Sequence, residues 1–281
     1  MGVVVYKFTD YNAEHTHKNG FGDMVRGLIS IKQIQQIMGF KLLVDMKGYF
    51  AGKFFKDHCP IMYDHYTIFK LYGNDQNNLL AIRDIIQDEF EKGYNIIAFN
   101  TNHYPVLELF NDEEKKQDMI QFMREVFTFT PEFERYFNER CEKIGNNYHL
   151  FHYRLGDKVL NEGESVRNLG FCVSHLLNYK KENSVLISDS LEFKEKIASI
   201  KSDIKVFLNK PVHSNSFMVD NSQKTDENFI DIMIDFFLIK NAQSISSYSV
   251  YDWTSNFVFW TSMIYGVPLT VLPNSYFIKN M

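Results

Sequence analysis

The sequence has few cysteines, few prolines and no long apolar run. Its 281 residues contain six prolines and three cysteines, an odd number with no C-x-x-C spacing. This pattern argues against a disulfide framework and is typical of reduced thiols in an intracellular protein. No stretch approaches the roughly 18 consecutive apolar residues that a membrane-spanning helix needs. The opening stretch MGVVVYKFTD turns polar too early for a signal peptide. We therefore expect a cytoplasmic protein with no membrane span.

Patterns typical of metal sites and of nucleic-acid binding are missing as well. Nine histidines are scattered, and neither the stretch 15–17 nor His58 and His65 has a cysteine or carboxylate partner at ligand spacing. No D-x-D motif stands at the end of an expected strand. A formal net charge of −5 argues against duplex nucleic acid as the main partner. We expect no metal site and no nucleic-acid partner.

The chain does contain enough apolar residues for a large core, and they follow a βα alternation. Hydrophobic residues make up 45% of the sequence and aromatic residues 16%. Short β-branched or aromatic runs predict strands at 3–8, 41–45, 95–100, 148–154, 184–189, 204–208 and 267–272. Helical patterns cover 24–40, 77–93, 111–127, 131–145, 165–181, 191–200, 223–241 and a stretch from about 252.

Two polar helical stretches, 111–127 and 131–145, interrupt the alternation, which then restarts. We therefore place one domain at 1–145 and a second at 146–281. Strands that alternate with helices in both halves predict an α/β fold of two Rossmann-like domains that face each other across a cleft. Ligands bind such sheets outside the carboxyl ends of the strands, so charged residues there are candidate site residues.

The stretch HYRLGDKVLNE, 152–162, places such charges where an expected strand ends. Arg154 can bind two phosphate oxygens at once, and Lys158 adds a second, compact cation. Two cations can neutralise a diphosphate leaving group where no metal does so. The alternative is a charged loop whose surface ion pairs contribute about 0–1 kcal/mol.

Glu162 is close enough in sequence to this cluster to act as a general base, with Lys158 tuning its basicity. Glu164 is also present in the same stretch, which can instead be a loop whose acids face solvent. Asp23, in an N-terminal glycine-rich turn, is a second candidate base.

The residues of this stretch resemble a family motif. His152, Arg154, Asp157, Lys158 and Glu162 match the pattern H-x-R-x-x-D-K-x-x-x-E of the α1,6-fucosyltransferases, both the animal core-fucosylating enzymes and the rhizobial nodulation-factor enzymes. The shorter pattern H-x-R-x-G-D resembles the wider fucosyltransferase superfamily, and the glycine at 156 fits it. Leucine stands at 155, where many members carry a second arginine.

The segment 18–48 resembles the N-terminal part of the nodulation-type enzymes, with a G-x-G-D turn, a helix and an apolar strand. Gly20 and Gly22 would let the backbone approach a ligand at the helix start, where N–H groups favour an anion. The alternative is an ordinary tight turn between a strand and a helix.

The segment 235–253 resembles the family's aspartate, hydrophobic helix end and Ser/Thr-rich turn. The resemblance places Asp235 near the base-recognition region, with His152 close by. The residues that fall in or near the phosphate-binding turn are Ser247, Ser249 and Tyr251. The alternative is an N-cap serine with ordinary packing.

Two further stretches have structural interpretations. Asp189, in a stretch similar to the family's strand-end S/T-D segment, suits the N-cap of the next helix as well as a ligand contact. The aromatic block 252–268 is better interpreted as a buried helix than as a platform for sugars.

The resemblance implies a GT-B-like, inverting glycosyltransferase that needs no metal or other cofactor. Its donor would be GDP-fucose, bound mainly by the C-terminal half, and a glycan acceptor would enter from the N-terminal half. The alternatives are the same scaffold with another sugar nucleotide, and a non-catalytic glycan-binding module on a degenerate GT-B fold. Neither the acceptor, the linkage nor the oligomeric state follows from the sequence.

Overall fold

The computed structural model describes residues 2–8, 20–57, 59, 69–71, 79–162, 164–200, 203–211 and 226–274, without the side chains of 69–71, 161, 162 and 226. The chain divides into two compact units, residues 1–130 and 131–281. This division differs from the expected boundary after residue 145. Helix α4 (Pro131–Ile144) belongs to the second unit because it packs against α8 (Asp226–Leu238).

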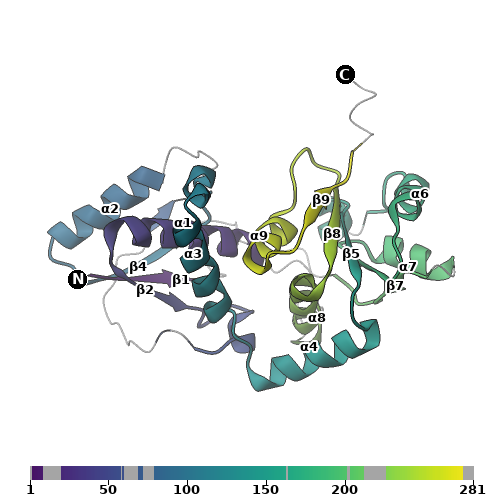
Figure 1. Ribbon diagram of the computed structural model, residues 1–281, viewed down its shortest axis with the longest axis horizontal. Helices are drawn as coiled ribbons and strands as arrows, with labels where there is room; N and C mark the ends of the chain where they lie inside the picture. Colours follow the sequence, from purple (N-terminus) through teal and green to yellow (C-terminus); the bar gives the residue numbers. More distant parts are fainter. Residues whose placement is uncertain are drawn as a thin grey trace. The chain divides into compact units, whose positions relative to one another are not determined.

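The first unit contains a four-stranded parallel sheet, drawn in purple and blue in Figure 1. Its strands are β1 (Val3–Lys7), β2 (Lys41–Asp45), β3 (Phe69–Leu71) and β4 (Ile96–Thr101), in the order β2-β1-β4-β3. Its helices are α1 (Phe21–Met38), α2 (Leu79–Glu91) and α3 (Glu113–Val126), with short 3-10 turns η1 (Gly52–Phe54) and η3 (Leu107–Asn111).

Helix α1 packs on the sheet at a point that only glycine fits. A Cβ atom on Gly27 would lie 1.8 Å from the carbonyl oxygen of Thr101, at the end of β4. The Tyr6 hydroxyl lies 2.5 Å from the same oxygen. In the expected helix 24–40, apolar residues recur every three positions from Val25 to Ile37. The first four of them are fully buried, whereas Ile37 is half exposed. The periodicity therefore identified the buried face correctly up to the last turn.

The second unit contains a five-stranded parallel sheet in the order β7-β6-β5-β8-β9. The strands are β5 (His149–Arg154), β6 (Ser184–Ser188), β7 (Lys205–Val206), β8 (Ser244–Ser249) and β9 (Leu269–Val271). Besides α4 and α8, its helices are α5 (Asp157–Glu162), α6 (Leu169–Tyr179), α7 (Leu191–Ser199), α9 (Asn256–Tyr265) and the 3-10 turn η5 (Ile239–Asn241).

Alternate residues of β5 face two different layers of this unit. Phe151 and Tyr153 join a core with Leu176 of α6 and Phe193 of α7. His152 faces the other way, stacked on Phe257 of α9. Figure 1 shows α6 and α7 on one side of the strands and α8 and α9 on the other. Both faces of the sheet are therefore covered, as in other parallel α/β folds.

The strand order defines a topological switch point in each sheet. In the second unit the chain runs from β5 outward through β6 and β7, then returns to the other side of β5 as β8. The equivalent point in the first unit lies between β1 and β4. Parallel α/β sheets bind ligands at such points, outside the carboxyl ends of the strands. The expected α/β architecture of two Rossmann-like units is confirmed.

Candidate functional site

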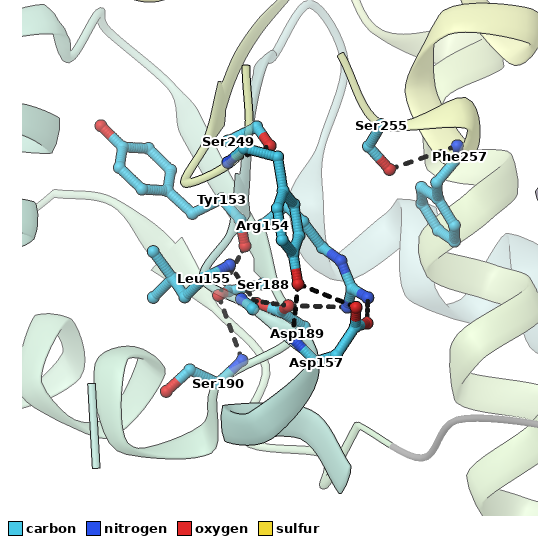
Figure 2. Close-up of polar contacts among 12 residues, drawn as sticks. Tyr153, Arg154, Leu155, Asp157, Ser188, Asp189, Ser190, Ser249, Ser255 and Phe257 are labelled. Atoms are coloured by element: carbon cyan, nitrogen blue, oxygen red, sulfur yellow. Dashed lines mark hydrogen bonds and ion pairs between the residues drawn. The ribbon is translucent and has the colours of Figure 1, made fainter. Parts of the chain in front are cut away.

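The candidate site lies at the switch point of the second sheet, where β5 and β8 end side by side. Arg154 and Ser249, the last residues of the two strands, are register partners. Asp189 directly follows β6, on the other side of β5. Figure 2 shows Arg154 between the carboxylates of Asp157 and Asp189. Three strand ends thus bring one arginine and two acids together, as the position of the motif predicted for Arg154 and Asp157.

Arg154 is held by these two carboxylates in different ways. Its side chain is 18% exposed, and one guanidinium nitrogen donates to Asp189 Oδ2 at 2.7 Å. The other terminal nitrogen pairs with Asp157, whose side chain is 58% exposed. The side chain of Asp189 is 8% exposed, so the more solvent-exposed of the two ion pairs is the one with Asp157.

Asp189 organises the loop that follows β5. Its carboxylate accepts hydrogen bonds from the backbone N–H groups of Leu155, at 2.7 Å, and Gly156, at 3.1 Å, as well as from Arg154. Burial raises the pKa of the Asp189 carboxyl, and the charge of Arg154 and the two N–H donors oppose that rise. Asp189 therefore fixes the position of Arg154 from a site 35 residues away in the sequence.

Asp189 does not cap helix α7, contrary to one of its two expected roles. Ser190 is the N-cap residue, and its Oγ accepts from the backbone N–H of Phe193 at 3.1 Å. The side chain of Ser188 turns back to donate to the carbonyl of Tyr153 at 2.9 Å. The carboxylate of Asp189 is thereby left for the loop after β5.

The glycine of the H-x-R-x-G-D motif has a conformational reason. Gly156 has φ of 126°, in a region that L side chains rarely adopt. This conformation directs its N–H toward Asp189. Leu155, where related sequences often carry arginine, is 6% exposed and belongs to the core on the α6 and α7 side. The residue at 155 therefore supports the loop from beneath and has no charge to offer a ligand.

His152 is buried beneath the strand end. Its Nδ1 lies 3.1 Å from the Oγ of Ser247, its register partner on β8, and its ring stacks on Phe257. Burial, assisted by the positive charge of Arg154, lowers the pKa of His152 to about 3. The imidazole is therefore neutral at neutral pH, and it cannot repel a cation or neutralise a phosphate.

The structure corrects the expected position of the serines. Ser247 and Ser249 lie within strand β8 and are buried, instead of forming a turn. Ser249 Oγ accepts from the backbone N–H of Tyr251 at 3.1 Å. The turn occupies 250–255, and Ser255 caps α9 by accepting from the N–H of Phe257 at 3.3 Å. Ser255 was missed, although a serine just before an apolar helical run is a known N-cap signal.

Tyr251 connects this turn to the β5 loop. Its hydroxyl accepts from the backbone N–H of Asp157 at 2.9 Å and donates to Asp157 Oδ2 at 2.8 Å. Asp157 is therefore shared between Arg154 and Tyr251. The loops that follow β5 and β8 are joined at Asp157, through both its carboxylate and its backbone N–H, and the Val250 N–H also donates to the Arg154 carbonyl at 3.0 Å.

Asp235 belongs to a largely buried cluster of charges from helices α4, α7 and α8. It lies on α8, 3.8 Å from Arg140 and 3.4 Å from the amide nitrogen of Asn209. Lys194, itself buried, donates to the carbonyl of Asn209 at 2.5 Å. Burial raises the pKa of Asp235, opposed by the charges of Lys194 and Arg140. Its Oδ1 is buried and accepts no hydrogen bond within the described part of the chain.

Of the residues expected to assist proton transfer in the second unit, the structure describes the side chain of Lys158 but not that of Glu162. Lys158 is 64% exposed, and its Nζ lies 3.7 Å from Glu164 Oε1. The stretch 157–162 is helical, so Lys158 and Glu162 are one helical turn apart in sequence. The side chain of Glu162 lies outside the described part of the structure. Glu164 is thus the acid seen beside Lys158.

In the glycine-rich turn before α1, Gly20 does not adopt a backbone conformation that is special to glycine. Gly20 is the N-cap of α1 with φ of −65°, a conformation open to any residue, and Gly22 lies in the first helical turn. Asp23, also in that turn, is 35% exposed and lies 3.4 Å from Arg26. Asp23 is close enough to solvent to meet a ligand of this unit.

The described residues lack two kinds of feature. They hold no group of three or more histidine, cysteine or acidic side chains that could bind a metal ion. None of the helices seen there is both long and apolar enough to cross a bilayer. The histidines at 15, 17, 58 and 65 lie outside the described part.

Comparison with solved structures identifies the fold. The NodZ α-1,6-fucosyltransferase soaked with GDP-fucose matches 98% of this chain and 96% of its own, with a TM-score of 0.55 and 16% identity. The Se-Met fucosyltransferase NodZ from Bradyrhizobium matches at 0.54 with 15% identity, over 98% and 95% of the chains. POFUT1 in complex with GDP matches at 0.51 with 10% identity, over 96% and 98%.

No family model and no curated protein matches the sequence. The likeness to solved structures extends over nearly the whole chain, and it shows that this protein has the GT-B-type fold of those fucosyltransferases. The fold expected from the resemblance is confirmed.

Proposed function

We propose that the protein is an inverting, metal-independent glycosyltransferase that moves fucose from GDP-fucose to a hydroxyl group of a glycan. The observation that carries the proposal is Arg154, held at a topological switch point by one nearly buried and one largely exposed carboxylate. The fold supports it, because solved structures with the same fold were determined with GDP or GDP-fucose.

The diphosphate would bind at Arg154. Its oxygens would take the place of Asp157 on the exposed side of the guanidinium, while Asp189 keeps the buried side. The N-terminus of α9, capped by Ser255, lies in the loop beyond β8 and offers N–H groups and a positive dipole end. Lys158 would add the second cation, so the charge of the leaving group is neutralised without a metal.

The guanine base would be recognised at Asp235. Guanine presents an N–H and an amino group side by side, and a carboxylate can accept from both. Within the described structure Asp235 Oδ1 makes no hydrogen bond, and its pairing with Arg140 Nη1, at 3.8 Å, is ionic only. The imidazole of His152, buried and stacked on Phe257, adds no charge that would compete for the base. Uracil lacks the paired donors, so this site would favour a guanosine nucleotide.

The acceptor hydroxyl would be deprotonated by a carboxylate, with Glu162 as the first candidate and Asp23 as the second. A hydroxyl is a weak nucleophile, and general-base assistance raises its reactivity by roughly 10²–10⁴. Inversion follows from a single in-line displacement in which the base works on one face of the sugar while GDP leaves from the other.

The decisive experiment compares sugar nucleotides. Thermal shift and donor hydrolysis would be measured with GDP, GDP-fucose, GDP-mannose, UDP-glucose and UDP-N-acetylglucosamine, each with and without EDTA. We expect stabilisation and turnover with the guanosine compounds only, and no effect of EDTA. Stronger binding of a UDP sugar would overturn the donor assignment. Binding of GDP-fucose without any turnover would favour the non-catalytic glycan-binding module.

A further inference from the structure

An exposed pair of stacked aromatic rings follows strand β8. Tyr251 and Trp253 lie parallel, with ring centroids 4.8 Å apart and an interplanar angle of 9°. Trp253 is 60% exposed, more than any other large hydrophobic side chain in the described residues. The sequence interpretation placed the whole block 252–268 in a buried helix. Helix α9 begins only at Asn256, and Trp260 is the tryptophan that it buries.

Tyr251 fixes the stacked pair in place. Tyr251 is bound through its hydroxyl to Asp157 and through its backbone N–H to Ser249. One face of the Trp253 indole therefore rests on an anchored ring, and the opposite face is open to solvent. A flat apolar ring that is already held rigidly can bind a ligand ring at a small cost in conformational entropy, because the side chain loses little freedom on binding.

The order of groups along the strands matches the order of groups in a nucleotide sugar. His152 and Ser247 form one register pair, and Arg154 and Ser249 form the pair two residues later on the same side of the strands, about 6.6 Å further toward the carboxyl edge. Tyr251 and Trp253 follow beyond that edge. If the base lies near His152 and the diphosphate at Arg154, the sugar comes next to the aromatic pair.

We propose that Trp253, supported by Tyr251, is the subsite for the sugar ring of the donor and favours a 6-deoxy sugar. This inference rests on the proposed function. The face of an aromatic ring carries partial negative charge and attracts the weakly positive C–H groups of a pyranose. Fucose carries a methyl group where galactose carries a hydroxymethyl group. An apolar indole face suits the methyl and leaves the extra hydroxyl without a partner.

The test uses calorimetry with GDP, GDP-L-fucose and GDP-L-galactose, which separates base and diphosphate from sugar and from the 6-hydroxyl. Trp253→Ala and Trp253→Phe would be compared with the wild type and with Tyr94→Ala. The last variant removes another half-exposed aromatic ring, from the first unit. In Trp253→Ala we expect the ratio of the GDP-fucose Kd to the GDP Kd to rise roughly threefold to tenfold.

The GDP Kd itself should stay within about twofold, Trp253→Phe should retain most of the sugar contribution, and Tyr94→Ala should match the wild type. The preference for GDP-fucose over GDP-galactose should shrink in Trp253→Ala. An unchanged ratio together with normal GDP binding overturns the sugar subsite alone. A wild type that binds neither GDP nor GDP-fucose overturns the proposed function instead.

Discussion

The two units place an arginine near the same edge of a similar sheet, yet use it differently. Arg26, on α1, is 4% exposed; it donates to the backbone carbonyl of Asn102 at 2.6 Å and lies over the ring of Tyr104. Arg154 is held by two carboxylates, one of them largely exposed. Arg26 thus ties a helix to the loop after β4, whereas the proposed function has Arg154 exchange its exposed partner for a diphosphate. The two arginines differ in burial and in their partners, and this difference separates the structural role of Arg26 from the role proposed for Arg154.

The largest expected effect tests this difference directly. Arg154→Ala should lower fucosyl transfer by about 10²–10³, because a charged donor to the leaving group is lost. The protein should still fold, with a lower melting temperature, because the Asp189 carboxylate keeps two backbone N–H donors but loses its ion-pair partner. Arg26→Ala should lower thermal stability while GDP affinity, measured by calorimetry, stays unchanged. Near-normal transfer by a folded Arg154→Ala protein would remove the basis of the contrast.

A second variant probes the packing of the first unit. Gly27→Ala places a methyl group against the Thr101 carbonyl and the Tyr6 hydroxyl, so α1 must shift. We expect a loss of about 1–3 kcal/mol in the free energy of unfolding, measured by urea denaturation. Gly170→Ala is the matched control, because a Cβ atom there meets nothing within 4 Å. Equal stability of the two variants would contradict the close packing at Gly27.

The choice of base can be settled by one pair of substitutions, one in each unit. Glu162→Gln keeps the size of the side chain and removes its basicity, so transfer should fall by about tenfold or more. GDP-fucose affinity should stay nearly constant. Asp23→Asn is the counterpart in the first unit, with a smaller effect expected. If Asp23→Asn abolishes transfer and Glu162→Gln does not, the base belongs to the first unit.

The smallest expected effect is that of metal removal. Since Arg154 and Lys158 would neutralise the leaving group, transfer should continue in EDTA. Mild stimulation by magnesium is compatible with this. A complete loss of turnover in EDTA that manganese restores would show that the two cations are insufficient.

Local patterns in the sequence anticipated much of the fold. The spacing of apolar residues located α1, and short β-branched runs located β1, β2 and β6. Strand β8 was missed because SISSYS is rich in serine, which ordinarily favours turns. It is a strand because it is paired on both sides, with β5 and β9, and tertiary pairing overrides local preference.

Some residues of the candidate site could likewise be predicted from the sequence, and others could not. Arg154 and Asp157 could be recognised because they lie three residues apart in one motif. The role of Asp189 could not, because its contacts with 154–156 connect separate strands that only the folded sheet brings together. The exposure of Trp253 was also hidden, since an aromatic run alone does not tell which residue precedes the helix.

The contrast between the two tryptophans gives the protein two optical reporters. The sequence contains no others; Trp253 is largely in water, whereas Trp260 is 2% exposed and its indole N–H donates to Asn256 at 3.2 Å. Trp253 should therefore emit at longer wavelength and be accessible to acrylamide, and Trp260 should emit at shorter wavelength and be shielded. A ligand that covers the site will change the first signal and leave the second, while loss of the α9 core will shift the second. Occupancy and integrity of the second unit can thus be followed separately in one unlabelled sample.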